Sequence, residues 1–137
     1  MLVLRRAAYD AIIDHAIDGQ PEEICGVLGG QFDEERSRVT SIYRATNVSE
    51  RPRTEYFMDP EEQLELLDEI EDQGDDVVGF YHSHPAGPTV PSTTDEARAT
   101  WPGYSYLIAA LDGHPFIGSW RWTGDTFEQE VVSVDGL

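Results

Sequence analysis

The feature that most constrains the fold is an apolar run in the middle of the chain, DDVVGFYHSH at residues 75–84. Strands that are covered on both faces read as continuous apolar runs, whereas strands with one face in water alternate between apolar and polar residues. The run therefore predicts a central strand with other elements on both sides of it. It ends in two histidines, and a loop rich in Pro, Gly, Ser and Thr follows.

The segments around this run predict helices and further strands. Apolar residues at helical spacing predict a helix over 4–18, which Gly19 and Pro21 end. A second helix is expected from its N-cap, Asp59, to about Gln73. A short helix is expected at 92–100, and further runs predict strands at 23–30, 38–47, 104–111, 115–122 and 126–134.

This order of elements indicates the α/β class, with a mixed β-sheet flanked by helices. The chain has 137 residues, about the usual size of one domain, so residues 1–137 are expected to form a single domain.

Acidic residues dominate the charge of the chain. There are 27 Asp and Glu residues against 9 basic residues, all arginine, and the net charge is −18. Such a surface repels nucleic acid. Because the acidic residues are spread along the chain, adaptation to a high-salt cytoplasm is favoured over an acidic face for a basic partner. The sequence has no signal-peptide pattern and no apolar run of the roughly 20 residues that span a bilayer, so a cytoplasmic protein without a membrane segment is expected.

The two histidines at the end of the central strand predict a metal site. Side chains two residues apart in a strand lie on the same face, so His82 and His84 can share one ion. Asp95, after ten further residues, can supply a third ligand, and three ligands of this type leave one position for water, as in a catalytic zinc site. The alternative is that Asp95 only interacts with the positive end of the short helix. Cys25, the single cysteine, is expected to be a core residue.

A hydrolytic zinc site also needs a general base. Two glutamates, Glu22 and Glu23, stand at the start of the first predicted strand, and alternation allows one of them to face the site. On the local pattern alone, two solvated glutamates at a strand start are the simpler interpretation.

Taken together, these motifs resemble the JAMM (MPN-plus) zinc metalloprotease family. The stretch GFYHSHPAGPTVPSTTD is similar to its His-x-His, ten residues, Asp pattern, with a serine three residues before the aspartate. EICGVLGG is similar to the family's upstream Glu-x-Cys-Gly strand start and aligns Glu23 with its glutamate. The resemblance covers nearly the whole chain and implies the JAMM/MPN fold, which is of the cytidine-deaminase-like kind.

By this resemblance, His82, His84 and Asp95 would bind Zn²⁺, Glu23 would be the general base and then acid, and Ser92 would stabilise the oxyanion. A helix N-cap is the other interpretation of Ser92. The family implies an isopeptidase that cleaves after the C-terminal Gly-Gly of a ubiquitin-like modifier, similar to small, haloarchaeal, desampylase-like members. A close variant would release cysteine or another adduct from a Gly-Gly sulfur-carrier protein.

Two other classes of protein have related patterns. Cupins also use His-x-His, but they are all-β and need a glutamate where this chain has Pro88 or Thr89. Relatives of the JAMM family that lost the metal serve as scaffolds, but such members usually lack at least one ligand.

Overall fold

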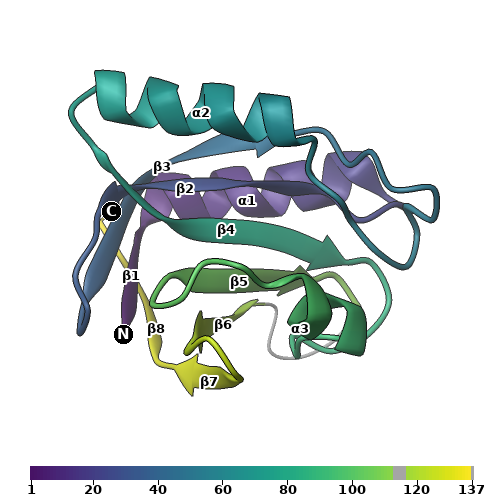
Figure 1. Cartoon of the computed structure of the whole chain (residues 1–137). Coiled ribbons are helices and arrows are strands. Elements are labelled where there is room, and N and C mark those ends of the chain that lie inside the picture. The colour runs from purple at the N-terminus through teal and green to yellow at the C-terminus, as the bar shows by residue number, and fades with distance from the viewer. Residues whose placement is uncertain (113–116, 137) are drawn as a thin grey trace.

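The computed structural model describes residues 1–112 and 117–136. Its strands form one eight-stranded sheet (Figure 1). In chain order the elements are β1 (Leu2–Arg5), α1 (Arg6–Gly19), β2 (Cys25–Gln31), β3 (Ser37–Ala45), α2 (Pro60–Asp72), β4 (Asp76–His84), α3 (Thr93–Arg98), β5 (Ser105–Ala110), β6 (Ile117–Trp122), β7 (Phe127–Glu130) and β8 (Val132–Asp135). The predicted α/β class is confirmed.

The strand order places the apolar run in the interior of the sheet. The order is β7-β6-β5-β4-β2-β3-β1-β8, so β4 has a neighbour on each side. It pairs antiparallel with β2 and parallel with β5, and β1 pairs parallel with both β3 and β8. The predictions of a central strand and of a mixed sheet are therefore confirmed.

The N-terminal residues form a strand that the sequence prediction missed. We expected a helix from residue 4, but Leu2–Arg5 is β1 and the helix begins at Arg6. Leu2, Val3 and Leu4 are almost fully buried between β3 and β8. Four residues carry too little periodicity to reveal a strand, and pairing with two distant segments decides their conformation.

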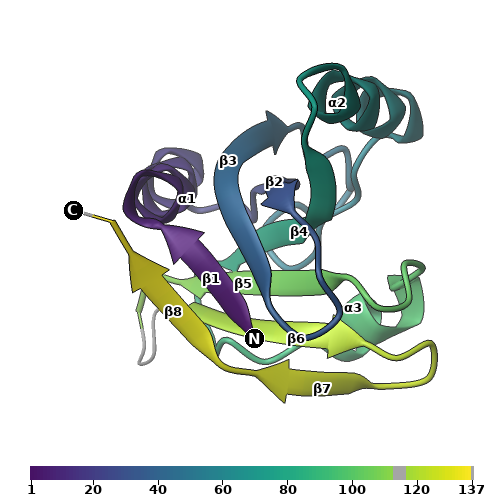
Figure 2. The same cartoon turned by 90° about the vertical axis from the view of Figure 1, so that its left-hand side faces the viewer.

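The predicted strand at 126–134 is two strands on opposite edges of the sheet. Residue Val131 alone separates β7, which pairs with β6, from β8, which pairs with β1. The sheet therefore curls until its two edges meet at this link, as Figure 2 shows. The backbone N–H of Leu2 donates to the carbonyl of Val131 at 2.8 Å and fixes this junction.

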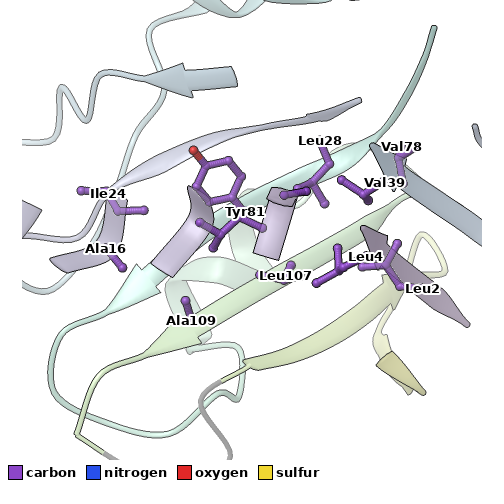
Figure 3. Packing of buried hydrophobic residues seen from close by; sticks show 12 residues of the cluster. Leu2, Leu4, Ala16, Ile24, Leu28, Val39, Val78, Tyr81, Leu107 and Ala109 are labelled. Carbon is purple, nitrogen blue, oxygen red and sulfur yellow. The ribbon is translucent and has the colours of Figure 1, made fainter. Parts of the chain in front are cut away.

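Helices cover both faces of the curled sheet. On one face, Ala8, Ile12 and Ala16 of α1 pack with a cluster that includes Leu28 and Tyr81 (Figure 3). On the other face, Leu67 and Ile70 of α2 pack with a second cluster. That cluster also contains Cys25, Val27, Met58, Phe80, Tyr106 and Trp122.

The second helix begins as its sequence predicts. The Asp59 side chain accepts a hydrogen bond from the N–H of Glu62, and Pro60 is the first helical residue. Among the residues described, no helix is long and apolar enough to cross a membrane. The predicted strand at 115–122 is seen from Ile117 onward, because residues 113–116 lie outside the described residues.

Candidate metal centre

The two histidines lie at the end of β4, on the face that α2 covers. Tyr81 and Ser83 alternate with them and point to the other face, which α1 covers. His82 and His84 are 2% and 8% exposed, so their imidazoles are almost withdrawn from solvent. Two buried imidazoles on one face need polar partners, because unpaired buried polar groups are costly.

Asp95 completes a group of three converging ligand atoms. Its Oδ2 lies 3.1 Å from Nε2 of His82 and 3.2 Å from Nε2 of His84, and the two Nε2 atoms are 3.2 Å apart. The three atoms thus form a nearly equilateral triangle. The structure brings together all three residues that the sequence motif singled out as ligands.

Helix α3 fixes the Asp95 carboxylate through a capping box. The N–H of Ser92 donates to Asp95 Oδ2 at 2.9 Å, and the Asp95 N–H donates to Ser92 Oγ at 3.0 Å. The N-cap interpretation of Ser92 is therefore correct. Its hydroxyl proton is not used in this motif, so an additional catalytic role for Ser92 stays a prediction.

A loop carbonyl orients the ring of His84. Nδ1 of His84 lies 2.7 Å from the carbonyl oxygen of Pro88, which can only accept, so Nδ1 carries the proton. In the neutral imidazole, Nε2 is then the unprotonated nitrogen and faces the triangle. This arrangement leaves Nε2 as the nitrogen that can bind a metal ion.

Burial and close polar contacts shift the pKa values of the three side chains in different directions. Burial lowers the pKa of His82. Burial acts in the same direction on His84, but hydrogen bonds with Asp95 and the Pro88 carbonyl outweigh it and raise that pKa. Burial would raise the pKa of Asp95, but the close contacts of its carboxylate with the two imidazoles and with the Ser92 N–H hold that pKa well below its usual value. Asp95 is therefore ionised at neutral pH, as metal ligation requires.

Glu23 lies just outside the triangle. Cys25 of β2 pairs with His82 of β4, so the chain before β2 passes alongside His84. One carboxylate oxygen of Glu23 and one ring nitrogen of each histidine lie within 4.8 Å of one another. Glu23, His82 and His84 could also form a ligand set. The contacts of Asp95 with the two histidines are shorter, so Asp95 is favoured as the third ligand and Glu23 as a neighbour of the metal centre.

The environment of Glu23 is unusual for a carboxylate. The residue is 5% exposed, and its Oε1 has no hydrogen-bond partner among the described residues. Burial raises the pKa of Glu23 to about 7. The neighbouring Glu22 is exposed, as alternation predicts for one of the two. The strand itself begins at Cys25 rather than at Glu23.

Contacts from a distant loop hold the backbone of Glu23. Its N–H donates to the carbonyl of Pro52 at 2.7 Å, and its carbonyl accepts from Nδ2 of Asn47 at 2.9 Å. The next residue is also held, because the N–H of Ile24 donates to Oγ of Ser83 at 2.9 Å. No local sequence pattern indicates these supports.

Tyr56 is a further site residue that sequence reasoning missed. Its ring stacks on the imidazole of His82, with centroids 4.4 Å apart and an interplanar angle of 26°. Cys25 is buried, and burial raises the pKa of its thiol to about 12, so it is a core residue as expected. His15 bonds to the Tyr81 hydroxyl and lies away from the site.

A groove with a volume of about 180 Å³ borders the candidate metal centre at Asp95. Its wall is mostly aromatic and apolar, with the guanidinium of Arg98 at one place. The lining residues are Tyr56, Phe57, Met58, Gln63, Phe80, Asp95, Arg98, Thr100, Trp101 and Tyr106. Such a groove can take an apolar side chain next to the site.

Known proteins resemble this chain over nearly its whole length. It is 46% identical to a desampylase of Haloferax volcanii, with 98% of this chain and 96% of that protein aligned. It is 36% identical to a CysO-cysteine peptidase of Mycobacterium tuberculosis, over 98% of this chain and 91% of that protein. The crystal structure of a JAB1/MPN domain protein of Archaeoglobus fulgidus, 19% identical, matches the fold with a TM-score of 0.66 and covers 97% of this chain and 98% of that one.

The family model described as prokaryotic homologs of the JAB domain matches residues 5–123. The cupin alternative is wrong, because residues 1–112 and 117–136 form three helices and a mixed sheet. The site residues lie inside the matched range, and the expected JAMM/MPN fold is confirmed. The chain belongs to the Prok-JAB family, the prokaryotic homologs of the JAB domain.

Proposed function

We propose that the chain is a zinc-dependent isopeptidase that hydrolyses the amide bond after the C-terminal Gly-Gly of a ubiquitin-like modifier. The observation that carries this proposal is the buried triangle of two Nε2 atoms and one carboxylate oxygen, with a second buried carboxylate beside it. The names of the relatives from Haloferax volcanii and Mycobacterium tuberculosis support the peptidase class.

The residues present fit zinc. For bonds of about 2.0–2.1 Å to N and O ligands, the edges of a tetrahedron are about 3.3 Å. The three ligand atoms are 3.1–3.2 Å apart, close to such a face. The unpartnered Oε1 of Glu23 further supports a group at this place that the protein itself does not supply.

His82, His84 and Asp95 would hold the zinc, which when bound lowers the pKa of a water ligand to about 7. Glu23 would take the proton from the attacking water, because a pKa of about 7 suits a general base near neutral pH. The water oxygen forms a bond to the carbonyl carbon of the last glycine, and the carbon–nitrogen bond breaks. Glu23 then passes the proton to the leaving amine.

The substrate's carbonyl oxygen becomes negatively charged as the water attacks. The Ser92 hydroxyl, whose proton is free, is proposed to donate to it. The modifier's C-terminal segment would lie in the groove beside Asp95, where aromatic walls suit an apolar side chain upstream of Gly-Gly.

A second substrate is a sulfur-carrier protein whose Gly-Gly terminus bears a cysteine. The similarity to the Mycobacterium tuberculosis peptidase favours it. Both reactions hydrolyse an amide after Gly-Gly, so the same residues would serve in each.

Two substrates and a chelator test this function. The protein is incubated with a modifier joined through Gly-Gly to a lysine side chain, and separately with a Gly-Gly-Cys carrier. Cleavage of the first is expected, with complete loss in excess chelator and recovery with added zinc. If neither substrate is cleaved, or if the chelator has no effect, the proposal is wrong. Cleavage of the second alone selects the sulfur-carrier reaction.

Neighbouring glutamates provide a matched pair of variants. Glu23→Gln is expected to lower kcat at least about 100-fold with zinc still bound, because the general base is lost but no ligand. Glu22→Gln, at an exposed position, is expected to keep native activity. His82→Ala should lose zinc and activity together. Near-native activity of Glu23→Gln would contradict the mechanism.

We also propose that residues 1–137 act as one catalytic domain, because strands from both ends of the chain pair in one sheet. A haloarchaeal source and a cytoplasmic location stay predictions; the relative from Haloferax volcanii supports the former.

A further inference from the structure

The loop between His84 and α3 connects two corners of the ligand triangle, and strand β6 holds it. The indole Nε1–H of Trp120 donates to the carbonyl of Thr89 at 2.9 Å. Thr89 itself is 5% exposed, so this loop residue is packed into the protein. The hydrogen bond crosses from one strand to a loop 31 residues earlier in the chain.

Gly118, two residues before Trp120, leaves the space that the loop occupies. A Cβ atom at this position would lie 2.8 Å from the Thr89 carbonyl oxygen and 2.9 Å from its Oγ1. Real Cβ atoms essentially never come so close to other heavy atoms, so a side chain at 118 would push the loop away. Gly118 and Trp120 therefore form one seat for Thr89.

Thr89 is the residue after Pro88, whose carbonyl contacts the imidazole of His84. Pro88 directly precedes Thr89, and its carbonyl accepts the Nδ1 proton of His84 at 2.7 Å. That bond directs Nε2 of His84 toward Asp95 and His82. A shift of Thr89 would move the Pro88 carbonyl and loosen the orientation of the ring.

We propose that Trp120 and Gly118 are positioning residues of the metal centre, which hold the Thr89 backbone so that the Pro88 carbonyl fixes His84 as an Nε2 ligand. This inference rests on the proposed metal site but not on the identity of the substrate. Partners of metal-bound histidines of this kind typically change metal affinity by 10–100-fold when they are removed.

Two tryptophans of β6 allow a matched comparison. Trp120→Phe keeps an aromatic ring and removes the N–H donor. Trp122→Phe makes the same chemical change at a residue that is 8% exposed and whose indole has no hydrogen bond to any residue in the described ranges. Zinc affinity is measured by competition with a chromophoric chelator, and the free energy of unfolding is measured on chelated protein.

We expect Trp120→Phe to bind zinc about 10-fold more weakly and Trp122→Phe to bind it within twofold of the native protein. Gly118→Ala should act in the same direction as Trp120→Phe. In the zinc-loaded protein, the NMR signal of the His84 Nδ1 proton should exchange faster with solvent in Trp120→Phe and stay unchanged in Trp122→Phe. A merely structural role of Trp120 would lower unfolding free energy without these two changes.

Zinc affinity within twofold of native in Trp120→Phe, or an equal loss in both tryptophan variants, would overturn the inference. These readouts need no substrate. A failure to cleave Gly-Gly conjugates would therefore refute the proposed function while leaving the Trp120 result interpretable.

Discussion

At the scale of single residues, burial lowers the pKa of two histidines that lie in different surroundings. His15 and His82 are both buried. His82 meets two other ligand atoms at the end of β4. Nδ1 of His15, on α1, lies 2.7 Å from the hydroxyl of Tyr81, and the His15 ring packs edge-on against the tyrosine. Burial therefore favours the neutral form of both histidines, one in the candidate metal centre and one in the core.

His15 should make stability depend on pH. Its pKa is lowered from 6.5 to about 4, mainly by burial and also by the charge of Arg44, while the charge of Asp18 acts in the opposite direction. Between these two pH values the unfolded chain binds a proton that the folded chain does not, so the free energy of unfolding falls as pH falls. The loss is absent above about pH 6.5, is complete below about pH 4, and amounts to at most about 3.4 kcal/mol.

Denaturant unfolding of chelated protein between pH 7 and 4.5 measures this term. His15→Gln cannot titrate, so the native protein should lose more stability than the variant across this range. Parallel pH curves for the two proteins would show that His15 is not the group responsible.

At the scale of secondary structure, the pairing of β4 with its two neighbours places the site. Antiparallel pairing with β2 brings the Glu23 segment beside His84. Parallel pairing with β5 holds the opposite edge of β4. Two glycines permit this close packing. A Cβ at Gly26 would lie 2.3 Å from the Tyr81 ring, and one at Gly79 would lie 2.0 Å from the carbonyl oxygen of Ser105.

Gly79→Ala should therefore separate β4 from β5. The obstructing atoms belong to the backbone of Ser105, which cannot rotate away, so we expect a loss of about 3 kcal/mol in unfolding free energy. Gly74→Ala is the comparison. Its Cβ would meet nothing within 4 Å, and its φ of +83° costs about 1–2 kcal/mol. Equal losses in the two variants, measured by urea unfolding, would argue against a steric role for Gly79.

At the scale of the whole molecule, the net charge of −18 is the dominant long-range effect. Helix α2 shows how it accumulates. Glu65, Asp68 and Glu69 are exposed on it, and its last turn contains no basic residue. Like charges one turn apart destabilise a helix, and added salt screens that repulsion.

Unfolding free energy should rise with salt. Between 0.1 M and 1 M salt the screening length falls from about 10 Å to about 3 Å, and we expect a gain of at least about 2 kcal/mol. The variant Glu65→Gln, Asp68→Asn, Glu69→Gln should gain less, because it carries less repulsion. Thermal or urea unfolding at several KCl concentrations measures both. A stability that is independent of salt would contradict adaptation to high salt and favour the alternative, an acidic face that binds a basic partner.

The features that depend on local backbone geometry can be predicted from the amino-acid sequence. A strand period of two puts His82 and His84 on one face, and a capping pattern at Ser92 and Asp95 begins α3. The central strand, α2 and the α/β class follow from apolar periodicity in the same way. Alternation allows only one of Glu22 and Glu23 to face the site, and the family resemblance points to Glu23; both are readable without coordinates.

Which distant segments meet depends on how the whole chain packs. This packing made Leu2–Arg5 a strand, divided the last predicted strand between two sheet edges, and brought Tyr56, Pro52 and Trp120 to the site. The reason is physical: strand pairing and burial are settled by the packing of the whole chain, whereas periodicity and capping depend on a few neighbouring residues.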